Sequence, residues 1–196
     1  MPRSLVVTCE HGGNRVPPRF LRLFRGRRAL LASHRGWDRG ALNLARGVAR
    51  ALHAPLFAST TTRLLVDLNR SPGHPRLHAP FVPRRERDAI VRRHYRPYRG
   101  AVESAIAARR RVLHLSVHTF TPVLRGRARD VDIGLLFDPS RAPERRLCAR
   151  WRGLLRAARP DLRVRRNSPY RGVSDGFTTR LRRRFPARRY LGVELE

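Results

Sequence analysis

The sequence contains no lysine, so all 44 of the basic residues among its 196 residues are arginine. This absence excludes the lysine-containing phosphate loop of many nucleotide-binding proteins. Only 14 residues are acidic, which leaves a net charge of +30. Such a charge is typical of proteins that bind nucleic acid, and it also arises when GC-rich coding spreads arginine over a solvated surface. The arginines are scattered along the chain without a nucleic-acid-binding signature, which favours the second explanation and predicts no specific nucleic-acid partner.

Other features are scarce as well. The two cysteines, Cys9 and Cys148, lie far apart in the chain and match no paired-cysteine metal site. No apolar run reaches the ~18 residues that a membrane-spanning helix needs, and no charged-then-apolar leader opens the chain. A GxSxG serine elbow and the local signatures of catalytic cysteines are also missing. We therefore expect a cytoplasmic protein without a membrane partner that is neither a serine nor a cysteine hydrolase.

The pattern of apolar residues predicts alternating strands and helices. The chain is 41% apolar, and its length suits a single domain spanning residues 1–196. Apolar runs with β-branched residues predict strands at 4–9, 55–60, 63–69, 112–120, 131–138, 162–167 and 189–196. Helical spacing predicts helices at 38–52, 84–110 with a possible break at Pro97, 143–158 and 174–184. This alternation predicts an α/β fold with a mixed, largely parallel central sheet.

Polar side chains gather where the predicted strands end. In open α/β sheets, ligands bind beyond the carboxyl ends of the strands. Burying so much polar chemistry costs several kcal/mol unless the groups are paired or bind a metal, so we expect one shared site. The residues concerned are Glu10, His11, Asp67, Asn69, Arg70, His118, Glu194 and Glu196.

These residue types suit a hydrolytic metal centre. Two imidazoles and a carboxylate are a common zinc ligand set, and the ion brings the pKa of water towards neutrality. A free carboxylate then serves as general base. Arginine can hold a substrate carboxylate through paired hydrogen bonds or stabilise an oxyanion.

Several motifs, in order, resemble one family. "CEHGGNRVP", "HRGWDRGA", "TTRLLVDLNRS", "SVHTFTPVLRGRARDVDIG", "NSPYRGVSDG" and "GVELE" together resemble the N-formylglutamate amidohydrolases. The resemblance covers nearly the whole chain. It implies a three-layer sandwich similar to that of zinc carboxypeptidases and aspartoacylase, and an amide hydrolase that uses one zinc ion.

The same resemblance implies metal ligands. His11 and His118 are the expected histidine ligands. The third ligand stays open. Asn14 occupies the position of a glutamate ligand in the related carboxypeptidases, Asp38 is the preferred substitute or else a helix cap, and Glu10 either orients His11 or is itself a ligand.

Further roles follow by the same analogy. Arg63 is expected to polarise the scissile carbonyl, or else to be one more surface arginine, and Asn69 and Arg70 to hold a substrate carboxylate. Tyr170 and Gly172 are expected to border the substrate pocket, or else to form an ordinary turn.

The last strand is expected to carry the general base. Glu194 and Glu196 lie two residues apart and share one face of that strand. The family pattern favours Glu196, and since the chain stops there within an apparent strand, we expect residues to follow it. Ser116 stands where typical members have an aspartate, which indicates a divergent subgroup.

The sequence thus predicts a zinc-dependent amidohydrolase that cleaves an N-acyl amino acid such as N-formylglutamate. Two alternatives stay open: a basic nucleic-acid-binding protein on the same fold, and an inactive relative that binds a metabolite.

Overall fold

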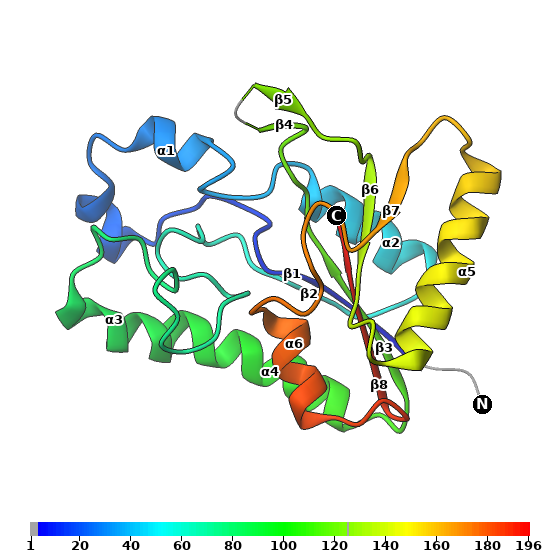
Figure 1. Cartoon of the computed structure of the whole chain (residues 1–196). Coiled ribbons are helices and arrows are strands. Elements are labelled where there is room, and N and C mark those ends of the chain that lie inside the picture. Colours follow the sequence, from blue (N-terminus) through cyan, green and yellow to red (C-terminus); the bar gives the residue numbers. More distant parts are fainter. Residues whose placement is uncertain (1–3, 125) are drawn as a thin grey trace.

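A six-stranded sheet forms the centre of the computed structural model, which describes residues 4–124 and 126–196 (Figure 1). The strand order is β2-β1-β3-β8-β6-β7. The first four strands run parallel, and the last two run antiparallel to them. The strands span β1 Ser4–Cys9, β2 Leu56–Ala58, β3 Val112–Val117, β6 Ile133–Leu136, β7 Val164–Arg166 and β8 Tyr190–Leu195.

Helices cover both faces of this sheet and make three layers. Helix α2 (Ala41–Ala51) and helix α5 (Ala142–Ala158) pack on one face, and helix α4 (Arg96–Ala107) and helix α6 (Phe177–Arg184) pack on the other (Figure 1). Because both faces are covered, the central strands are buried along most of their length. The predicted α/β fold with a mixed, largely parallel sheet is confirmed, whereas the single domain stays a prediction.

One prediction about local structure was wrong, and the helix predicted at 84–110 is present without a break at Pro97. Residues 63–69 form no strand, because Leu64, Leu65, Val66 and Leu68 are all buried in a second apolar cluster, and a run buried on every side need not be extended. Residues 84–107 continue through Pro97 as helix α3 (Arg84–Ile90), a π-helical turn η2 (Val91–Tyr95) and α4. Pro97 lies in the first turn of α4, where a proline is tolerated.

The second apolar cluster lies beside the sheet. It joins a 3-10 helix η1 (Pro18–Phe24) and helix α1 (Arg28–Ala32) to the irregular segment 62–82 and to α3. Residues 121–130 include the short strands β4 (Val123–Leu124) and β5 (Arg127–Ala128), which pair antiparallel; residue 125 lies outside the described residues.

Two predicted absences can be compared with the fold. Cys9 and Cys148 are both buried and both free. A search of the described residues finds no helix long and apolar enough to cross a membrane.

Candidate metal centre

Three polar residues lie together just beyond the carboxyl ends of the neighbouring strands β1, β3 and β8. The parallel register aligns Thr8 with Ser116 and Ser116 with Glu194. Two residues further on, just beyond each strand, come Glu10, His118 and Glu196. Side chains two apart on a strand share a face, so this row points in a common direction. The structure thus brings Glu10, His118 and Glu196, three of the residues singled out in the sequence, together at the strand ends.

Glycines explain how the chain can turn after Glu10 and His11. A side chain on Gly13 would place its Cβ 2.8 Å from the carbonyl oxygen of Thr60. The backbone therefore passes directly over the segment after β2, and Arg15 forms a bridge with Thr61. This close approach brings the end of β1 against the segment that carries the later site residues.

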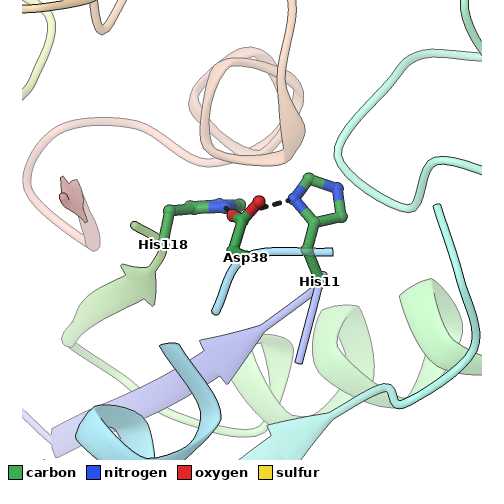
Figure 2. Close-up of side chains that lie close together, drawn as sticks. All are labelled: His11, Asp38 and His118. Atoms are coloured by element: carbon green, nitrogen blue, oxygen red, sulfur yellow. Dashed lines mark hydrogen bonds and ion pairs between the residues drawn. The ribbon is translucent and has the colours of Figure 1, made fainter. Parts of the chain in front are cut away.

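Asp38 joins the two histidines. Its backbone N–H donates to the His11 carbonyl at 3.0 Å, and no side chain caps α2. Its Oδ2 lies 3.2 Å from His11 Nδ1 and 2.9 Å from His118 Nδ1 (Figure 2). Ligand atoms of His11, Asp38 and His118 lie within 4.8 Å of one another, and all three residues are buried. This group could hold a metal ion, and the position of Asp38 fits its interpretation as a third ligand better than that as a helix cap.

Each histidine has a second carboxylate on its other ring nitrogen. His11 Nε2 lies 2.7 Å from Asp67 Oδ1, and His118 Nε2 lies 3.3 Å from Glu10 Oε2. Both imidazoles therefore present Nδ1 to Asp38, and a second carboxylate contacts Nε2 of each ring. Histidines that bind a metal through one nitrogen commonly donate the other N–H to a carboxylate.

The charged side chains of the cluster shift one another's pKa values. Burial opposes ionisation of Asp38, yet the neighbouring His11 and His118 keep its pKa below the usual range. Asp67 follows the same rule, with Arg63 and His11 lowering its pKa. For His118, burial would lower the pKa, but hydrogen bonds to Asp38 and Glu10 outweigh it and raise the pKa well above normal.

Counting charges shows what the site demands. Glu10, Asp38 and Asp67 are buried carboxylates. Arg63 contacts Asp38 and Asp67, and Arg70 forms a longer ion pair with Asp67 at 4.0 Å. The two arginines leave at least one of the three negative charges unmatched. Protonated histidines can supply the remaining positive charge, and so can a divalent ion bound to neutral imidazoles.

Arg63 lies within the cluster and is not simply one more surface arginine. Its Nη2 lies 2.7 Å from Asp67 Oδ2, and its Nη1 lies 3.2 Å from Asp38 Oδ1. The guanidinium is thus anchored by two carboxylates beside the candidate metal position. It lines the same cleft as the histidines.

The two candidate general bases differ in their surroundings. Glu194 Oε1 accepts a hydrogen bond from the Thr178 hydroxyl at 2.5 Å. Among the described residues, no side-chain hydrogen bond or ion pair holds the Glu196 carboxylate. Burial raises the pKa of Glu196 to about 7, with His118 opposing and Glu194 adding to the rise. A free carboxylate with such a pKa is well suited to proton transfer at neutral pH.

Asn69 and Arg70 lie on the irregular segment after Asp67 and line the cleft. Asn69 Oδ1 accepts from the Phe177 backbone N–H at 2.6 Å, and Arg70 Nη1 donates to the Asp175 carbonyl at 2.7 Å. Arg70 Nε is buried and has no hydrogen-bond partner within the described part of the chain, although it forms a long ion pair with Asp67 Oδ2 at 4.0 Å. A bound carboxylate could supply the hydrogen-bond acceptor that this N–H lacks.

Three other predicted residues lie further from the centre. Tyr170 lines the cleft, is 47% exposed, and accepts a hydrogen bond from Arg129. Gly172 is buried, and a Cβ there would lie 2.2 Å from Phe137 N, so close packing explains this glycine without a substrate contact. Asn14 is exposed and donates to the Leu31 carbonyl, away from the cluster.

The cleft itself has a volume of about 770 Å³. The basic residues that line it beyond the central groups are His34, Arg35, His74, Arg76 and Arg171. The carboxylates of Asp38, Asp67, Asp175, Glu194 and Glu196 also line the cleft, so it carries both signs of charge. Its arginines could pair with an anionic group of a small ligand.

Sequence reasoning missed supporting residues on α4. The Tyr98 hydroxyl donates to Glu10 Oε1 at 3.1 Å, and Arg99, buried over Phe177, donates to the carbonyls of Leu68 and Arg70. Both residues belong to a helix with an ordinary amphipathic pattern. No signal in the sequence distinguishes them from solvated helix residues.

Comparisons with known proteins agree with this geometry. No curated protein matches the chain. A crystal structure of gene product Atu2144 from Agrobacterium tumefaciens is similar over 99% of this chain and 80% of its own, with 33% identity and a TM-score of 0.80. The family model for N-formylglutamate amidohydrolase matches residues 3–196. The chain therefore belongs to the N-formylglutamate amidohydrolase family.

Proposed function

We propose that this protein is a zinc-dependent amidohydrolase that cleaves the amide bond of an N-acyl amino acid such as N-formylglutamate. The observation that carries the proposal is the convergence of His11, Asp38 and His118 in one cleft, with their ligand atoms within 4.8 Å of one another. Two imidazole nitrogens and one carboxylate oxygen match the ligand set of hydrolytic zinc sites. When bound, such an ion acidifies water and polarises a carbonyl group.

The chain's own residues would divide the remaining work. Arg70, whose Nε–H has no hydrogen-bond acceptor among the described residues, and Asn69 would hold the substrate carboxylate in the cleft. Arg63 would donate to the acyl oxygen as negative charge develops on it. This arrangement places the scissile amide between the arginines and the histidine cluster.

Glu196 would move the proton. It removes a proton from the attacking water as the oxygen bonds to the acyl carbon, and then gives that proton to the nitrogen as the C–N bond breaks. The products are a carboxylate and a free amine. Glu194 is the weaker candidate for this step, since its carboxylate already accepts the Thr178 hydroxyl.

The test combines metal content with hydrolysis. Purified protein is analysed for zinc, and N-formyl and N-acetyl amino acids with acidic and neutral side chains are assayed for amine release. We expect about one zinc per chain and preference for anionic substrates. His118→Ala should lose zinc and activity together. The exposed His53 has φ +47°, a conformation that asparagine tolerates, so His53→Asn is a matched control that should keep both.

The competing hypotheses predict other results. An inactive metabolite-binding relative would bind an N-acyl amino acid without hydrolysing it. Retention of zinc in His118→Ala would contradict the ligand assignment. A protein that takes up no zinc after metal-free preparation and zinc addition would contradict the proposed function itself.

A further inference from the structure

Glu10 has surroundings that the reaction outlined above does not use. Its side chain is 1% exposed. Its Oε1 accepts the Tyr98 hydroxyl at 3.1 Å, and its Oε2 accepts the Ser116 hydroxyl at 2.7 Å. Among the residues that the structure describes, its ion-pair partner is His118, with Oε2 3.3 Å from Nε2. A buried carboxylate costs several kcal/mol unless its charge is matched, so its pairing with this histidine requires an explanation.

The orientation of His118 separates its two nitrogens by role. Nδ1 faces Asp38 at 2.9 Å, on the side of the candidate metal position. Nε2 faces the Ser116 hydroxyl at 3.0 Å and Glu10 at 3.3 Å. A neutral histidine that gives Nδ1 to a metal must carry its proton on Nε2 and needs an acceptor there. The Asn69 amide is more distant, at 3.4 Å, and its nitrogen is a donor.

The strand pairing explains why this acceptor comes from a neighbouring strand. Thr8 pairs with Ser116 in the parallel β1–β3 register. Glu10 and His118, each two residues further on, therefore end up side by side. Ser116 lies on the same face and fills the space between them, where its hydroxyl donates to Glu10 and can accept from His118.

Glu10 is poorly placed to bind the metal directly. It meets His118 at the ring nitrogen opposite the one that faces Asp38. The group of ligand atoms that could hold an ion contains His11, Asp38 and His118, without Glu10. The contact with His118, and not with His11, also differs from the sequence-based expectation that Glu10 orients His11.

We propose that Glu10 is a positioning residue that fixes the orientation of His118 from β1, and that the Ser116 hydroxyl holds the two side chains in register. This inference rests on the proposed metal-dependent function. It predicts that the carboxylate can be supplied from either strand. Ser116 Oγ lies within hydrogen-bond distance of both partners, so an aspartate introduced at that position would place an oxygen near His118 Nε2.

The experiment measures zinc affinity by competition with a chromophoric chelator. Glu10→Gln should weaken zinc binding about 10–100-fold, the usual cost of losing such a partner. The double variant Glu10→Gln/Ser116→Asp should recover most of that loss. A residue that merely stabilised the fold would not be replaced by a carboxylate arriving from another strand.

A matched control separates positioning from stability. Glu144 of α5 is another fully buried carboxylate, and it pairs with Arg182 of α6. Glu144→Gln should lower thermal stability and leave zinc affinity unchanged. If Glu10→Gln does not fold, Ser116→Ala carries the test, with an expected severalfold loss of affinity.

The outcomes are distinguishable. A parent protein that binds no zinc contradicts the proposed function. A parent that binds zinc while Glu10→Gln binds it equally well overturns the role of Glu10. An unrescued loss in the double variant also overturns it, since the loss would then reflect damage to the local structure.

Discussion

His11 Nε2 lies 2.7 Å from Asp67 Oδ1, and the other oxygen of that carboxylate pairs with Arg63. Asp67 therefore joins the back of one candidate metal ligand to the arginine proposed to bind the acyl oxygen. One side chain sets the position of both.

Asp67→Asn should weaken both functions. An amide oxygen can still accept from His11, but it no longer supplies the charge that matches Arg63. We expect zinc affinity to fall about 10–100-fold. At saturating zinc, kcat should remain depressed because Arg63 is no longer anchored. Chelator competition and steady-state kinetics measure the two effects separately, and a variant with parental values in both would refute this linkage.

Zinc uptake should release protons. Because the carboxylates raise the pKa of both His11 and His118, the metal-free histidines hold protons at a pH where free histidine is neutral. Zinc needs the neutral form, so its affinity should fall as the pH is lowered through the raised pKa values. Calorimetry in buffers of different ionisation enthalpy counts the released protons. Binding without proton release would mean that the histidines were already neutral.

Glu196→Gln should abolish most turnover and keep the metal. Loss of a general base typically costs about 10²–10⁴-fold in rate. The base works ionised, and since burial raises the pKa of Glu196 to about 7, parental kcat/KM should decline as pH falls below that value. Glu194→Gln is the comparison, with a smaller expected loss. A larger loss in Glu194→Gln would exchange the two assignments.

Arg70→Lys should raise KM and leave kcat nearly unchanged. Lysine keeps the charge but lacks the planar pair of donors that fits a carboxylate. Losing one hydrogen bond to a charged group costs about 1.5–3 kcal/mol, or roughly tenfold or more in KM. The exposed Arg92 gives the control Arg92→Lys, for which no change is expected. Equal KM values in parent and Arg70→Lys would remove Arg70 from the substrate contacts.

Nucleic-acid binding should be weak at physiological salt. A shallow hollow at the amino-terminal ends of β3 and β8 is lined by five arginines, Arg109, Arg110, Arg111, Arg188 and Arg189. Arg109 and Arg189 donate to carbonyls at the end of α4, so part of this charge caps a helix. A titration of duplex DNA against salt measures the effect. Tight binding at 0.15 M salt with a steep salt slope would support the polyanion hypothesis instead.

The fold class could be predicted from the sequence. Strands that are buried on both faces of a sheet are short apolar runs, and the helices that cover those faces show helical periodicity, so the two patterns alternate along the chain. Sequence reasoning missed that β6 and β7 reverse direction, since a short buried strand has the same composition either way. It mistook residues 63–69 for a strand because periodicity cannot separate an extended run from a buried irregular one.

In the candidate site, the ionisable and polar residues at the strand ends could be recognised from the sequence. The residues that contact them could not. Asp38 lies on a loop before α2, and only the folded chain shows that its carboxylate meets both histidines. Glu10 was expected either to orient its neighbour His11 or to be a metal ligand. The alternation of side chains along a strand instead turns it towards β3, a contact that requires knowledge of which strands are adjacent.

The antiparallel pairing beside β8 has a consequence for how this enzyme family could diverge. Gly134 and Glu196 exchange two backbone hydrogen bonds, at 3.0 and 3.1 Å. A methyl group on Gly134 would meet the Ser168 carbonyl at 2.4 Å and the Glu196 Cβ at 3.3 Å. A larger residue at position 134 is therefore excluded next to the proposed base, whereas the exposed lining residues Arg35, Arg76 and Arg171 can be substituted without such a clash. Changes in substrate preference would thus be tolerated more easily at these arginines than beside Glu196.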